Sequence, residues 1–112
     1  MKNNEIQYIE FLSKDFDKVK KFYADAFGWK FTDYGAEYIA FEGGCVSGGF
    51  GLGEIVQGSI LVILLTDNLE ESLQSVKDAG GKITQGIFSF PGGRRFHFAD
   101  LEGNELAVWC KE

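Results

Sequence analysis

The chain has 112 residues, a length that suits one domain with its own hydrophobic core. Hydrophobic residues make up 45% of the chain and aromatic residues 15%, which excludes intrinsic disorder as its main state. Its net charge of -6 is spread along the sequence without a basic cluster, which argues against nucleic acid and anionic membranes as partners.

The first half of the chain predicts a strand, a helix and three further strands. Residues 6–12 alternate in polarity, so Ile9 and Phe11 share one face of a strand while Tyr8 and Glu10 share the other. Apolar residues then recur at helical spacing up to a glycine. The remaining predicted elements are a helix from the N-cap Asp15 to Gly28 and strands at 29–34, 37–42 and 45–52, with Gly35 and Gly43-Gly44 in the turns.

The second half repeats this order of elements. A shift of 52 residues places residues of the same type on one another, which indicates an internal duplication. The aligned pairs are Asp15 with Asp67, Gly28 with Gly80, Lys30 with Lys82, and Thr32 with Thr84. The predicted elements are a strand at 59–66, a helix capped by Asp67 or Asn68 and ended by Gly80, and strands at 82–89, 93–100 and 105–111.

Together these elements predict an α+β fold in a single domain, residues 1–112. The domain would hold two tandem βαβββ modules, at about 5–53 and about 58–111, in a curved, mostly antiparallel sheet. A helix would cover one face of each half. The other, concave face would enclose a ligand cavity, so we expect the functional residues there.

The two cysteines, Cys45 and Cys110, lie far apart and lack the spacing of a zinc or redox motif. We favour two buried free thiols over a disulfide, and Cys45 is the better candidate for a functional role. The longest apolar run is too short to span a bilayer, and no signal sequence opens the chain. We therefore expect a cytoplasmic protein without a membrane partner.

Three segments resemble one known family along almost the whole chain. They are Asp17–Trp29 (DKVKKFYADAFGW), Leu73–Lys82, and Arg95–Trp109 (RFHFADLEGNELAVW), where Leu101 and Glu102 replace the usual Pro-Asp. The chain is therefore identified as similar to the vicinal oxygen chelate superfamily of glyoxalases, bleomycin resistance proteins and extradiol dioxygenases. The resemblance implies paired βαβββ modules around a ligand cavity.

The resemblance also implies a metal site, which this sequence does not reproduce. Metal-dependent members take His and Glu ligands from the first and last strand of each half. Here those positions fall on Tyr8, on Ile60 or Leu61, and on Ala107, while residues 45–52 contain no His, Asp or Glu. We therefore expect no cofactor; a divalent metal held by displaced ligands is the alternative.

His97 and Glu10 are the candidate catalytic residues, because they are the strand-borne groups that could exchange a proton. Alternation places His97 and Arg95 on the open face, where the arginine suits an anionic ligand. His97 could equally be a hydrogen-bonded sheet histidine. Glu10 could be a partly buried carboxylate, or it could form a salt bridge with Arg94 or Arg95.

Tyr8, Phe50 and Trp109 are candidates for an aromatic wall that stacks on a planar ligand, with core or dimer packing as the alternative. The glycines around Phe50 lack the Lys and the following helix of a phosphate loop. They predict a bulged strand that lines the cavity.

The leading hypothesis is a metal-free, small-molecule-binding protein that forms a homodimer, with His97, Glu10 and Arg95 as polar anchors. By resemblance, the model for its action is sequestration of the bleomycin type. The alternative is an enzyme: a glyoxalase-like lyase or isomerase, or a dioxygenase-type enzyme, with displaced ligands or His97 and Glu10 as acid and base. A third possibility is a dimerising interaction module with a vestigial cavity.

Overall fold

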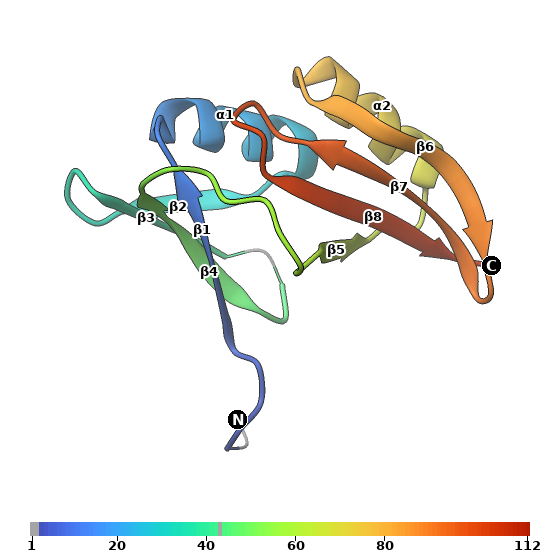
Figure 1. The fold of residues 1–112 in the computed structure, drawn as a ribbon, viewed down its shortest axis with the longest axis horizontal. Helices are drawn as coiled ribbons and strands as arrows, with labels where there is room; N and C mark the ends of the chain where they lie inside the picture. Colours follow the sequence, from blue (N-terminus) through green and yellow to red (C-terminus); the bar gives the residue numbers. More distant parts are fainter. Residues whose placement is uncertain (1–2, 43) are drawn as a thin grey trace.

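A computed structural model describes residues 3–42 and 44–112, so Gly43 of the predicted Gly43-Gly44 turn lies outside the described residues. It contains two four-stranded sheets and two helices (Figure 1). The elements are β1 (Tyr8–Ser13), α1 (Phe16–Phe27), β2 (Lys30–Asp33), β3 (Tyr38–Glu42), β4 (Ser47–Leu52), β5 (Val62–Leu65), α2 (Leu69–Asp78), β6 (Lys82–Phe90), β7 (Gly93–Ala99) and β8 (Glu105–Lys111).

The two sheets have the same topology. Sheet A has the order β1-β4-β3-β2 and sheet B the order β5-β8-β7-β6. In each sheet the first and last strands of the module pair in parallel, and the other pairs are antiparallel. The prediction of an α+β fold built from two βαβββ modules is therefore confirmed.

The sequence marks both ends of α1 and the start of α2, whereas α2 ends at Asp78 with Ala79 as its C-cap, one residue before the predicted Gly80. The Asp15 side chain accepts hydrogen bonds from the backbone amides of Asp17 and Lys18, and Gly28 ends α1 with a left-handed φ of 74°. Asn68, the second of the two predicted candidates, caps α2 by accepting from the amide of Glu71.

Both helices lie on the same side of the molecule, above the sheets in Figure 1. Phe22 and Phe27 of α1 place their rings 6.0 and 5.6 Å from the ring of Phe98 in β7. Helix α1 therefore packs against sheet B as well as sheet A, and one hydrophobic core runs through both modules. The faces of the sheets turned away from the helices are called the open faces below.

The turn between β7 and β8 ties the modules together with polar contacts. Buried Asp100 accepts a hydrogen bond from the hydroxyl of Tyr23 at 3.0 Å. Glu102, which departs from the family pattern, accepts from the Ser13 hydroxyl at 3.0 Å and from the backbone amide of Asp15 at 2.7 Å. The replacement therefore supplies acceptors for the loop that leads into α1.

Three local predictions are wrong. The strand predicted at residues 59–66 is shorter in the structure, because β5 begins at Val62. Ile60 therefore lies outside the strand and is 85% exposed. Strand β4 pairs with β1 in an unbroken register, and the irregular pairing lies instead in β6, around Gly86. Cys45 is exposed, although Cys110 is buried as expected, and both are free thiols.

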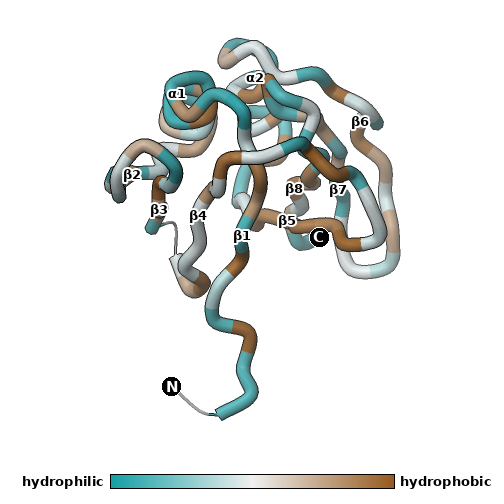
Figure 2. Tube along the Cα trace, turned by 60° about the vertical axis from the view of Figure 1, so that its left-hand side comes forward, coloured by the Kyte–Doolittle hydropathy of each residue, from teal (hydrophilic) through white to brown (hydrophobic). Residues whose placement is uncertain are grey.

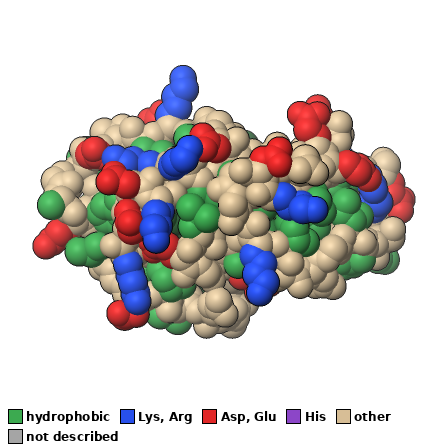
Figure 3. Space-filling model, turned by 90° about the horizontal axis from the view of Figure 1, so that it is seen from above, with side chains coloured by type: hydrophobic (Ala, Val, Ile, Leu, Met, Phe, Trp, Pro, Cys, Tyr) green, Lys and Arg blue, Asp and Glu red, His purple; other side chains and the backbone are tan. Residues whose placement is uncertain are grey.

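The surface shows three further features. The segment before β1 projects away from the body of the molecule, and β5 is a hydrophobic stretch near its outside (Figures 1 and 2). Over the helices, acidic and basic side chains are interspersed (Figure 3). Neither helix in the described part of the chain is long and apolar enough to cross a membrane.

Candidate functional site

The open face of sheet B carries a group of aromatic and basic side chains, called the arginine face. Phe96 and Phe98 of β7 are fully buried beneath the helices. Because successive strand residues point to opposite faces, the residues between and before them point to the open side. The arginine face consists of Phe88, Phe90, Arg95, His97 and Trp109.

Arg95 lies between two aromatic rings. Its guanidinium carbon is 5.3 Å from the centre of the Phe88 ring and 5.6 Å from that of Phe90. Its Nε is buried and has no hydrogen-bond partner among the described residues. The rings hold the cation in place through cation–π attraction, while its donors stay available to an acceptor.

The irregularity in β6 brings the first of these rings into place. Gln85 pairs with His97, yet Phe88 pairs with Arg95, so β6 contains one residue more than its partner between these two pairs. A further shift lies between Ile83 and Gln85, so Ile83 and Ile87 both pack against the core and Phe88 faces the open side. These β-bulges change which residues of β7 lie opposite β6, and they place Phe88 opposite Arg95.

His97 is mostly buried on the same face, with 13% of its side chain exposed. Its Nδ1 lies 3.8 Å from Oε2 of Glu105, and that oxygen also accepts a hydrogen bond from the Thr84 hydroxyl at 2.9 Å. Its Nε2 is buried and, like Nε of Arg95, has no partner within the described residues. Two nitrogen atoms on one face thus lack the partner that buried polar groups normally have.

The open face of sheet A carries a different group, called the tyrosine face: Tyr8, Glu10 and Tyr38. The hydroxyls of Tyr8 and Tyr38 are 2.6 Å apart, and Tyr38 donates to Oε1 of Glu10 at 2.9 Å. Desolvation, followed by these hydrogen bonds, raises the pKa of the Tyr38 hydroxyl above its ordinary value. Each polar group on this face already has a partner.

The glycines of β4 make room for the tyrosine face. A side chain on Gly49 would collide with the hydroxyl of Tyr38 and with the backbone oxygen of Ile39. One on Gly48 would collide with the ring of Phe41 on the opposite side of the sheet. Because these glycines have no side chains, the rings of Tyr38 and Phe41 can pack over β4, one on each face. This close packing accounts for the glycine-rich run without a bulge.

The structure places five of the six predicted site residues on the open faces, in two groups. Arg95, His97 and Trp109 come together on the arginine face, as alternation predicts. Tyr8 and Glu10 share the open face of sheet A, so the expected acid–base pair of Glu10 and His97 does not form within one chain.

Phe50 and the proposed salt bridge of Glu10 are corrections. Phe50 is fully buried and stacks on Phe11 at 5.0 Å on the helix side of sheet A, so it is not part of a wall with Tyr8. Glu10 is exposed and bonds to Tyr38, while Arg94 pairs with Glu70 at 2.6 Å on the other face of β7.

Three residues of these faces were not predicted: Tyr38, Phe88 and Phe90. Strand alternation could have placed Phe88 and Phe90 on one face, because they are two residues apart. The place of Tyr38 on this face could be predicted only from the register of the sheet, which sets β3 next to β4 and brings Tyr38 within reach of Glu10 in β1.

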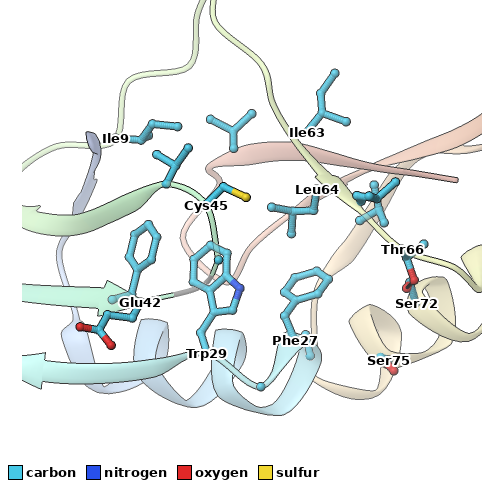
Figure 4. A pocket seen from close by; sticks show the side chains of 18 of the residues that line it. Ile9, Phe27, Trp29, Glu42, Cys45, Ile63, Leu64, Thr66, Ser72 and Ser75 are labelled. Atoms are coloured by element: carbon cyan, nitrogen blue, oxygen red, sulfur yellow. Dashed lines mark hydrogen bonds between the residues drawn. The ribbon is translucent and has the colours of Figure 1, made fainter. Parts of the chain in front are cut away.

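A cleft of about 850 Å³ separates the two modules on the helix side of the sheets. The unpaired edges of β1 and β5 face it, together with the end of α1 and the start of α2. In Figure 4, Phe27, Trp29 and Leu64 converge on this space, with Glu42 at one end and Ser72 at the other. Cys45, the cysteine that the sequence favours for a functional role, lines the cleft, but none of the six predicted catalytic and ligand-binding residues does.

The residues present do not fit the metal site that the resemblance implies. Glu10 and Glu105 are the carboxylates that face the open side from the first and last strands of the modules, and they lie on different sheets. The other open-face positions there are held by residues such as Gly49, Ile63 and Ala107. No group of three His, Cys, Asp or Glu side chains in residues 3–42 and 44–112 could hold a metal ion.

Comparison with known proteins identifies relatives of this arrangement. The model of the Glyoxalase/Bleomycin resistance protein/Dioxygenase superfamily matches residues 5–108. A comparison with curated proteins gave no match.

Solved structures with the same fold have low sequence identity. A glyoxalase/bleomycin resistance protein/dioxygenase family enzyme from Burkholderia phytofirmans PsJN superposes with a TM-score of 0.85 at 13% identity, over 96% of this chain and 99% of that one. A glyoxalase-related enzyme from Fulvimarina pelagi gives 0.83 at 20%, over 96% and 88%. TnmS3, an antibiotic-binding protein from Streptomyces sp. CB03234, gives 0.74 at 18%, over 100% and 99%.

Proposed function

The chain belongs to the glyoxalase/bleomycin resistance protein/dioxygenase superfamily, and we propose that it binds a small organic molecule without using a metal ion. The binding site is the arginine face, and the ligand is a planar molecule that carries an anionic or strongly accepting group. The observation that carries the proposal is the buried, unpartnered Nε of Arg95, held between the rings of Phe88 and Phe90.

The chemistry of the face supports this ligand class. An arginine side chain binds carboxylates through charge-assisted hydrogen bonds, which are stronger than neutral ones. Phe90 and Trp109, whose ring centres are 6.1 Å apart, offer apolar surface to a ring system. Nε2 of His97 adds a second polar contact. The same fold is found in an antibiotic-binding protein as well as in proteins described as enzymes, so the fold is compatible with ligand binding.

We further propose that the protein is a homodimer in which the tyrosine face of one chain covers the arginine face of its partner. Contacts between the modules run through the helices and the turn after β7, and the two open faces do not contact each other within the described chain. Leu65 on the open side of β5 is 62% exposed in a single chain, so a partner chain could cover this apolar side chain. Sedimentation equilibrium tests this arrangement, and a monomer at all concentrations would contradict it.

The binding proposal is tested by calorimetric titration with 2-naphthoate, a planar aromatic carboxylate. We expect saturable binding that Arg95→Gln weakens by about ten- to a hundredfold, as for the loss of a hydrogen bond to a charged group. Arg94→Gln is the matched control, because Arg94 points to the other face and pairs with Glu70. Equal binding by the two variants would refute the assignment of the arginine face.

The metal-free part of the proposal has its own test. Protein purified without chelators is assayed for bound metal, and its thermal unfolding is followed with added zinc, nickel or manganese ions. Specific binding of an ion to the folded state raises its stability by mass action. We expect neither bound metal nor a stabilising shift; stoichiometric metal with such a shift would favour a glyoxalase-like enzyme.

A further inference from the structure

The cleft between the modules is lined by none of the residues of the arginine face, although it reaches Ile63 and Leu65 on the open side of β5. Its walls include Phe11 and Leu64, which pack against the core on the helix side of their sheets. The arginine face lies on the other side of sheet B. The two tryptophans of the chain are divided in the same way, with Trp29 in the cleft and Trp109 on the arginine face.

The walls of the cleft are apolar and not fully covered. Ile9, Phe27, Trp29 and Val62 all line it, and each is only partly buried. Figure 4 shows the rings of Phe27 and Trp29 directed to the same space. A volume of about 850 Å³ lies within the range of sites for drug-sized ligands. The cleft therefore suits a molecule with an apolar body.

The charged groups of the cleft all have the same sign. Glu42, Asp67 and Glu71 are its charged lining residues, and no Lys, Arg or His of the described chain lines it. Neither Glu42 nor Asp67 forms an ion pair or a side-chain hydrogen bond with a described residue. Carboxylates beside low-dielectric walls produce a local field that attracts cations.

The start of α2 also borders the cleft, and a helix start normally favours anions. Here that preference is offset. Asn68 already accepts from the backbone amide of Glu71 at 3.1 Å, and both Glu70 and Glu71 lie in the first turn. The hydroxyl of Ser72 donates to that of Thr66 at 2.8 Å. An anion would meet carboxylates with few free donors.

We propose that this cleft is a second binding site, and that its ligand is an organic cation with an apolar body. The apolar walls hold the body of the ligand, and the carboxylate of Asp67, at the end of the cleft next to α2, holds its positive charge. The site would take a ligand of opposite charge to that of the arginine face. One chain would thus carry an anion site and a cation site on opposite sides of sheet B.

Two probes of equal shape and opposite charge test the proposal: tetraphenylphosphonium and tetraphenylborate. Binding is followed by the fluorescence of Trp29 in a Trp109→Phe background, so that the arginine face gives no signal. We expect a saturable change with tetraphenylphosphonium and none with tetraphenylborate over the same concentration range. Equal responses to both probes, or no response to the cation, would overturn the proposal.

Substitutions test which carboxylate makes the cleft select a positively charged ligand. Asp67→Asn should weaken tetraphenylphosphonium binding by about threefold to fivefold, because one exposed charge pair is lost. Glu37→Gln is the matched control, since Glu37 is an exposed carboxylate that does not line the cleft. Unchanged affinity in Asp67→Asn would refute the role of this carboxylate. Thermal unfolding confirms that each variant is folded.

Two other results have a definite meaning. If Trp29 is shielded from acrylamide in a dimer and becomes accessible on dilution, a second copy of the chain covers the cleft and the proposal fails. If 2-naphthoate binds in an Arg95-dependent manner while the cation gives no Trp29 signal, the cleft proposal fails and the proposed function stands. The reverse result would leave the cleft proposal and refute the arginine face.

Discussion

The two modules have apolar residues at equivalent positions on the helix side of their sheets, but the residues on their open faces differ in chemistry. The sheets match in register when the pair Phe11–Phe50 is superposed on the pair Leu64–Val108. On the helix side, each of these positions is apolar in both modules. Packing under a helix therefore places the same demand on both halves of the duplicated chain.

On the open side, the same register aligns residues of different chemistry. Tyr38 occupies the position of Arg95, because Tyr38 pairs with Gly51 and Arg95 pairs with Trp109. Small residues in module 1 correspond to large ones in module 2. The further equivalent pairs are Ala40 with His97, Gly49 with Ala107, Gly51 with Trp109, and Glu10 with Ile63.

This difference explains why the polar side chains of the tyrosine face bond to one another, whereas Arg95 on the arginine face has no such partner. In module 1 the carboxylate of Glu10 accepts the hydrogen bond of Tyr38. In module 2 the equivalent of that carboxylate is Ile63, so Arg95 has no acidic partner in its own sheet. Divergence after duplication has therefore produced a saturated face and an unsaturated one, and the unsaturated face is where we place the ligand.

The largest expected effect concerns the helix side. Phe98→Ala should lower the free energy of unfolding by about 3–5 kcal/mol, because it removes a fully buried ring that contacts α1 and leaves a cavity. Phe90→Ala on the open face should cost much less, since that ring is only half-buried. Urea unfolding measures both. Equal losses would show that the open face contributes to stability as much as the core.

The second prediction gives module 1 a residue of module 2. Gly49→Ala introduces the residue found at the equivalent position 107, and its methyl group would collide with Tyr38 and with the backbone of Ile39. We expect a loss of about 2–3 kcal/mol in the free energy of unfolding. Gly51→Ala is the control, because its methyl group would meet its neighbours at an ordinary 3.9 Å. A stable Gly49→Ala variant would refute the steric role of this glycine.

The third prediction places a carboxylate in module 2 at the position that Glu10 occupies in module 1. Ile63→Glu places an acid at the position equivalent to Glu10, where it can pair with Arg95 or His97. Calorimetry should show about a threefold to fivefold loss of 2-naphthoate affinity, because the new carboxylate competes with the ligand for Arg95 as one exposed charge pair. Ile63→Gln has the same shape without the charge and should bind nearly as the parent does. Little change in stability is expected, because Ile63 is 42% exposed. Undiminished affinity in Ile63→Glu would contradict the proposal.

The sequence determines the helix side of this fold more clearly than the open side. The alternation of Phe96 and Phe98 with their neighbours was enough to place Arg95 and His97, because a strand has a period of two residues. It failed for Phe50, whose neighbours in β4 are mostly glycines and give no contrast between polar and apolar positions.

Other parts of the site depend on register and on breaks in it. The contact of Tyr38 with Glu10 joins β3 to β1 across β4, and no local pattern sets that alignment. The pairing of β6 with β7 shifts twice, between Ile83 and Gln85 and between Gln85 and Phe88, so no local pattern predicts that Phe88 lies opposite Arg95. The cleft arises from the packing of two modules, which strand and helix patterns within each module do not specify.

The smallest effect tests the saturated face. At neutral pH, Tyr38→Phe removes two hydrogen bonds on an exposed face and should cost about 1 kcal/mol. Because the folded-state pKa of Tyr38 is raised above the unfolded value near 10, the folded state keeps its proton longer. The parent protein should therefore lose stability as the pH rises above about 10, and Tyr38→Phe should lose less.

Part of that alkaline slope should remain in the variant. Burial, and then the charge of Asp100, raises the pKa of Tyr23, which titrates in the same direction. Urea unfolding between pH 9 and pH 11 compares the parent protein with Tyr38→Phe and with the control Tyr34→Phe, whose hydroxyl bonds to no described residue. If all three proteins show the same slope, the tyrosine face is not the saturated network that distinguishes module 1 from module 2.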